Sequence, residues 1–103
     1  MDALARLQQW YLDQCDGDWE HTYGIEISSL DNPGWHLQVD LADTALAGKA
    51  FATVHYGMFD EAATSGHEWI HCQVEDDRFS AAGGPHKLGE LIDVFLRWAE
   101  AAA

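Results

Sequence analysis

A chain of 103 residues is long enough for one domain, residues 1–103, with one hydrophobic core. Hydrophobic residues make up 48% of it, which excludes an intrinsically disordered chain. Eighteen Asp and Glu residues against five Lys and Arg residues give a net charge of −13 at pH 7, which disfavours nucleic acid and anionic membranes as partners. Such a charge keeps a protein soluble, and it also attracts a basic partner.

The start of the chain and its cysteines predict a cytoplasmic protein. Met1 leads directly into an amphipathic segment, without the basic and apolar stretches of a secretory signal, and no stretch has the length to cross a bilayer. A secreted domain of this size more often carries several cysteine pairs, whereas this chain has only Cys15 and Cys72. We expect both thiols to be reduced and to act as small hydrophobic side chains of the core.

The first predicted element is a helix over residues 2–15. Asp2 can cap its first turn, and Gly17 ends it because glycine adopts the left-handed conformation at low cost. The apolar side chains recur at helical spacing. They are Leu4, Leu7 and Tyr11, with Trp10 beside them.

Alternation of apolar and polar residues predicts an antiparallel hairpin next. Residues 23–28 alternate, and residues 35–41 alternate more regularly than any other part of the chain. Pro33 and Gly34 stand between them, at the two central positions of an expected type II turn. One face of this sheet is therefore expected to be apolar and the other polar.

The second half of the chain predicts further strands and a closing helix. After a looser segment at 43–49 we expect a strand at 51–59, a loop at 62–66, a strand at 68–75 and a short strand at 78–81. A helix over 86–101 follows, in which Asp93 and Arg97 can pair on the exposed face. Its apolar stripe consists of Leu88, Leu91, Ile92, Phe95 and Ala99.

The predicted fold class is α+β. The N-terminal helix precedes a four- to five-stranded antiparallel meander sheet, and the C-terminal helix follows it. Neither helix can bury its apolar stripe alone, so we expect both to pack on one sheet face.

One string matches the H-E-x-x-H pattern of zinc peptidases, at His67, Glu68 and His71. That pattern binds zinc when a helix places both histidines on one face, whereas the alternation around this string is that of a strand. On a strand, residues four apart lie about 13 Å apart, too far to share one zinc ion. We therefore predict no catalytic residues, no metal and no cofactor, and the alternative is a small metal-dependent hydrolase.

The tryptophans divide into two groups. Trp35 lies on the apolar side of its strand and is predicted to be in the core, and Trp98 lies beside the stripe of the last helix and is predicted to be half-buried. Trp19 follows an acidic turn, and Trp69 shares a sheet face with polar residues. Each of these two either packs on its neighbours or is an exposed anchor for protein binding.

Two stretches of the sequence resemble the immunity protein 53 family of bacterial polymorphic toxin systems. They are residues 10–21 with 23–25 and residues 30–35 with 39–41, and residues 68–72 and 83–85 also fit, so the resemblance spans nearly the whole chain. The resemblance implies a cytoplasmic antitoxin that binds a cognate toxin domain and blocks it. It brings no catalytic residues and no established contact residues.

The charge suggests where such a protein binds. A nuclease toxin would have a basic cleft, which an acidic protein can occupy as a polyanion mimic. The candidate toxin contacts are Asp16, Asp18, Trp19, Glu20, Trp69, Glu75, Asp76 and Asp77. The sequence leaves open whether the two acidic turns share one edge of the sheet, and whether the protein is a monomer or a homodimer. It also leaves open a protein-binding adaptor unrelated to toxins.

Overall fold

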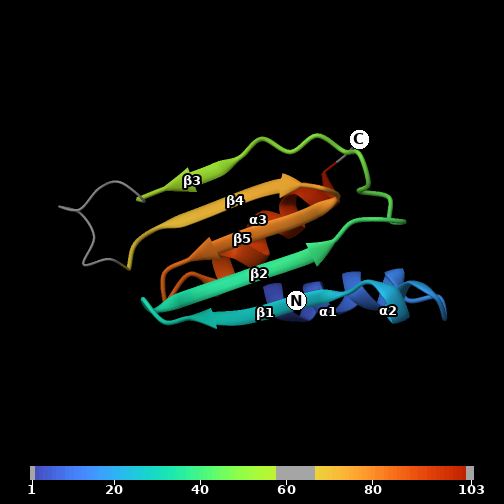
Figure 1. The fold of residues 1–103 in the computed structure, drawn as a ribbon, viewed down its shortest axis with the longest axis horizontal. Coiled ribbons are helices and arrows are strands. Elements are labelled where there is room, and N and C mark those ends of the chain that lie inside the picture. The colour runs from blue at the N-terminus through green and yellow to red at the C-terminus, as the bar shows by residue number, and fades with distance from the viewer. Residues whose placement is uncertain (1, 58–66, 102–103) are drawn as a thin grey trace.

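The computed structural model describes residues 2–57 and 67–101 (Figure 1). The elements in chain order are α1 (Ala3–Gln14), α2 (Trp19–Thr22), β1 (Ile25–Leu30), β2 (Gly34–Asp40), β3 (Val54–Tyr56), β4 (Ile70–Glu75), β5 (Arg78–Gly83) and α3 (Leu88–Glu100). The α+β class is confirmed, with an antiparallel sheet between an N-terminal and a C-terminal helix. Within the described residues, no helix is long and apolar enough to span a membrane.

The strand order is β1-β2-β5-β4-β3, which differs from the predicted meander. After β2 the chain crosses to the far edge of the sheet, and β3, β4 and β5 then return toward β2 (Figure 1). β5 is the central strand and lies between β2 and β4, so β2 and β5 pair although they are distant in sequence. Val39 of β2 lies opposite Phe79 of β5 and Leu37 opposite Ala81, and all four are buried. Burial of these apolar pairs stabilises the contact between β2 and β5.

Both long helices lie on one face of the sheet, as predicted (Figure 1). α3 packs on β2, β4 and β5, with Leu91 and Phe95 completely buried. Its Asp93 and Arg97 form the predicted ion pair at 2.7 Å. The opposite face of the sheet carries the polar side chains of the strands, such as His36, whose ring nitrogen lies 3.2 Å from Ser80 Oγ.

α1 packs on α3 through a different stripe from the one predicted. Leu7 is buried, and Ala3 and Trp10 pack on the core. Leu4 and Tyr11 instead remain 53% and 37% exposed. The helical spacing of the apolar residues predicts the helix correctly, but α1 lies at the edge of the sheet, where only part of its apolar surface packs on a neighbouring element.

The predicted cap and end of the first helix are confirmed, whereas the predicted turn of the hairpin is wrong. Asp2 accepts a hydrogen bond of 2.8 Å from the backbone N–H of Ala5, and Gly17 has a φ of 92°. The type II turn is wrong, because Gly34 is already the first residue of β2, paired with Leu30, and the Asn32–Pro33 peptide bond is cis. The tight reversal therefore lies one residue earlier, at 31–33.

The later elements lie close to their predicted positions. The strand predicted at 51–59 is β3, which ends at Tyr56, and Phe59 and the loop at 62–66 lie outside the described residues. The strands predicted at 68–75 and 78–81 are β4 and β5. The short helix α2 is not among the predicted elements, because four residues are too few to show a helical period.

Candidate functional site

Two hydrogen bonds bring the two acidic turns to the same end of the sheet. The indole N–H of Trp19 donates to the backbone O of Ala42 at 2.9 Å, and the backbone N–H of Leu41 donates to the backbone O of Asp77 at 2.8 Å. Leu41 and Ala42 directly follow β2. The loop before α2 and the turn between β4 and β5 therefore meet at the end of β2, which is on the right in Figure 1.

We call this region the acidic end. Its carboxylates are Asp16, Asp18, Glu20, Asp40, Asp43, Glu75, Asp76 and Asp77. Among the residues the structure describes, only Asp40 of this set is ion-paired with a Lys or Arg, at 2.9 Å from the Arg78 Nε. Arg6, Lys87 and Arg97 pair with other carboxylates, and Lys49 donates to the backbone O atoms of Trp98 and Ala101, so the acidic end keeps a large net negative charge.

Two carboxylates of the acidic end hold the loop before α2 in shape. Asp16 accepts hydrogen bonds of 2.9 Å from the backbone N–H groups of Trp19 and Asp18, which lower the pKa of its carboxyl. The pKa of Glu20 is also lowered, first by its own backbone N–H and then by the N–H groups of Asp16 and Gly17. Both residues therefore stay ionised, and both have a structural role in addition to any contact they make.

The lowered pKa values in this loop predict that part of the protein's stability depends on pH. A carboxylate whose pKa is lowered by folding stabilises the protein above its unfolded pKa, about 4.3 for Glu, and this contribution is lost as the pH falls through the folded pKa. We expect Glu20→Gln to lower the free energy of unfolding at pH 7 and to change it less at about pH 3. Urea unfolding at both pH values measures this. Glu26→Gln, on β1, is the control, and an equal effect of Glu20→Gln at both pH values would refute the assignment.

Trp19 is buried, with only 5% of its surface exposed. The interpretation of this residue as an exposed anchor is therefore wrong. Its ring makes edge contacts with Trp10 and Tyr11 at centroid distances of 6.2 and 6.1 Å and a tilted contact with Tyr23. Trp19 joins the acidic loop to α1 and to the end of β2, so it fixes the position of the acidic end.

Trp69 directly precedes β4, which begins at the opposite end of the sheet from the acidic end (Figure 1). It is half-buried, and its backbone O accepts a hydrogen bond of 3.0 Å from the N–H of Gly84. A side chain at Gly84 would place Cβ 1.8 Å from the backbone O of His67, so this position requires glycine. Trp69 is thus separate from the other candidate contacts.

The other tryptophans and the cysteines divide between the core and its rim. Trp98 is half-buried as predicted, whereas Trp35 only packs against the core, and its indole N–H donates to the backbone O of Pro85 at 3.0 Å. Cys72 is buried as predicted, and burial raises its pKa to about 12. Cys15 is a free thiol at an intermediate position, so the prediction that it belongs to the core is wrong.

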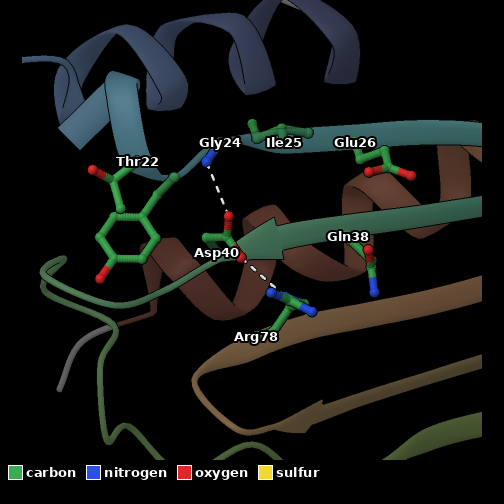
Figure 2. A pocket seen from close by; sticks show the side chains of 8 residues that line it. Thr22, Gly24, Ile25, Glu26, Gln38, Asp40 and Arg78 are labelled. Atoms are coloured by element: carbon green, nitrogen blue, oxygen red, sulfur yellow. Dashed lines mark hydrogen bonds and ion pairs between the residues drawn. The ribbon is translucent and has the colours of Figure 1, made fainter.

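A hollow of about 370 Å³ lies beside the acidic end on the open sheet face (Figure 2). Asp40 lies at its centre, where the carboxylate accepts a 3.0 Å hydrogen bond from the backbone N–H of Gly24 and pairs with Arg78. Thr22 and Tyr23 line this hollow and also a second one, whose walls include Asp16, Asp18 and Asp43. The acidic end is therefore a continuous, indented surface.

The H-E-x-x-H string does not have the geometry of a zinc peptidase. His67 lies before β4 and His71 within it, so no helix aligns the two rings. Glu68 pairs with Lys87 Nζ at 2.6 Å, and this cation lowers the pKa of the Glu68 carboxyl. Across residues 2–57 and 67–101, no group of three or more His, Cys, Asp or Glu side chains is arranged to hold a metal ion.

The sequence profile of the immunity protein 53 family matches residues 4–100. The chain belongs to this family. The match confirms the resemblance and covers all strands of this immunity protein 53 chain. No curated protein and no solved structure matches the chain.

Proposed function

We propose that this immunity protein 53 chain is a cytoplasmic antitoxin that binds the toxin domain of its own system and neutralises it by covering a basic surface of that domain with the acidic end. Family membership supports the antitoxin role. We choose the acidic end as the binding surface because two acidic turns, distant in sequence, converge there at one end of the sheet. The protein acts by occupation and performs no reaction of its own.

The acidic end is held in place before any partner arrives. Trp19 ties the first loop to Ala42, Leu41 ties β2 to Asp77, and Asp40 ties the start of β1 to Arg78. A surface that is already ordered loses little conformational entropy when it binds. Carboxylates without cationic neighbours also attract a basic surface over a distance, which speeds association.

A nuclease is the class of toxin that this surface fits best. Such an enzyme holds phosphates in a basic cleft, and closely spaced carboxylates offer that cleft a similar pattern of negative charge. The indented form of the acidic end, with hollows on both sides of Thr22 and Tyr23, provides room for long Lys or Arg side chains.

Growth rescue tests the proposal. A candidate toxin domain, from a large open reading frame just upstream of this gene, is expressed from an inducible promoter, with this chain or an empty vector in the same cells. We expect growth only in the presence of the chain, and stoichiometric co-purification of the chain with a catalytically inactive toxin. Absence of both rescue and complex would refute the antitoxin role, whereas a complex without rescue would indicate an adaptor.

A further inference from the structure

β1 is an open edge of the sheet, because among the strands of the described residues it pairs only with β2. The backbone O of Gly24 accepts a 3.0 Å hydrogen bond from the N–H of Asp40. Gly24 and Asp40 are therefore a hydrogen-bonded pair, and such pairs alternate with non-hydrogen-bonded pairs along β1 and β2. In an antiparallel pair, the peptide groups of every second residue point to the partner strand. Those of Ile25, Ile27 and Ser29 therefore point away from the sheet, toward any strand laid beside it.

An apolar groove runs along this edge, between β1 and α1. It has a volume of about 280 Å³ and is lined by Leu4, Leu7, Gln8, Tyr11, Ile25 and Ile27. Leu4, Tyr11 and Ile27 keep 53%, 37% and 39% of their surfaces exposed. Three large apolar side chains beside unpaired peptide groups form a surface that fits an extended segment with apolar side chains at alternate positions.

The charges around the groove indicate which side chains such a segment would carry between its apolar residues. Glu26 lies between Ile25 and Ile27 and points to the opposite sheet face, where it lines the hollow around Asp40 (Figure 2). Within the described part of the chain, no Lys or Arg lines the groove, and Arg6 of α1 pairs with Asp93 and Glu100 instead. A strand added to β1 would place one of its side chains beside Glu26, which favours Lys or Arg at that position.

We propose that an extended segment of the toxin domain, with apolar residues at alternate positions and a Lys or Arg beside Glu26, adds to β1 as a sixth strand of the sheet. This inference rests on the antitoxin role proposed above and names part of the contact. Ile25 lines both the groove and the hollow beside the acidic end, so one partner can cover both surfaces. A second copy of this chain fits less well, because each copy carries a charge of −13.

Two exposed leucines of α1 give a matched test. Leu4 lines the groove and Leu12, 62% exposed, does not. We expect Leu4→Lys to raise the Kd for the inactive toxin domain about tenfold or more, because it places a cation where an apolar side chain packs, and Leu12→Lys to change it less than about threefold. Thermal unfolding of both variants verifies that they are folded.

Ser29→Pro tests the backbone contact separately, because Ser29 does not line the groove. It removes an N–H that points away from the sheet and leaves the bonds between β1 and β2 in place, and we expect a similar rise in Kd. If the wild type binds the toxin domain and rescues growth, but Leu4→Lys binds with unchanged affinity, this inference alone is overturned. If the wild type neither binds nor rescues, the antitoxin role is overturned as well. Light scattering that shows a wild-type dimer and a Leu4→Lys monomer would identify a second copy as the occupant and also overturn it.

Discussion

Reversal of charge at the acidic end is expected to weaken toxin binding at least about 100-fold, which corresponds to about 2.7 kcal/mol. The variant combines Asp18→Lys and Glu75→Lys with Asp76→Asn and Asp77→Asn. Asparagine is used at the last two positions because their φ angles are 54° and 56°, and asparagine tolerates this left-handed region whereas lysine does not. Titration of the inactive toxin domain by calorimetry measures the change.

A matched pair of single variants separates local charge from total charge. Asp18→Lys at the acidic end and Asp31→Lys in the turn between β1 and β2 change the net charge equally, but Asp31 lies at the other end of the sheet. We expect Asp18→Lys to raise the Kd about tenfold and Asp31→Lys to leave it within about twofold. Equal effects would show that total charge, and not the acidic end, determines affinity.

Trp19→Ala is expected to lower the free energy of unfolding by about 3–5 kcal/mol, the usual cost of removing a buried aromatic side chain. The residue is 5% exposed, and its loss would leave a cavity among Trp10, Tyr11 and Tyr23. The backbone O of Ala42 would also lose its indole donor. Urea denaturation measures the change.

Two further variants support this prediction. Trp19→Phe keeps an aromatic ring but removes the donor, so it should cost less than Trp19→Ala. Leu12→Ala removes an exposed side chain from α1 and should change stability by less than about 0.5 kcal/mol. A stability of Trp19→Ala equal to that of Leu12→Ala would contradict the position of Trp19 in the core.

The sequence predicts the elements well because their signals are local. Alternation over 35–41 correctly predicts that Leu37 and Val39 of β2 are buried, and the stripe of 86–101 does the same for Leu91, Ile92 and Phe95 of α3. The strand order is not local. Nothing in β2 or β5 alone shows that they pair, and a meander is the simplest interpretation of strands that follow one another.

The candidate site is likewise predictable only where its signals are local in sequence. The acidic residues are visible in the sequence, but their convergence depends on the contacts of Trp19 with Ala42 and of Leu41 with Asp77. The burial of Trp19 is missed for the same reason, since its partners come from α1 and from the end of β2. An acidic turn around a tryptophan is typical of an exposed contact, and only the tertiary contacts show that it is an anchor of the fold.

The association rate of the wild-type chain with its toxin domain, measured against salt concentration, tests the central claim most directly. Surface charges attract a partner only over the screening length, which shortens as salt is added. If the acidic end meets a basic surface, the association rate constant should fall at least about tenfold between about 0.05 M and about 0.5 M NaCl. A rate constant that does not change over this range would contradict the claim.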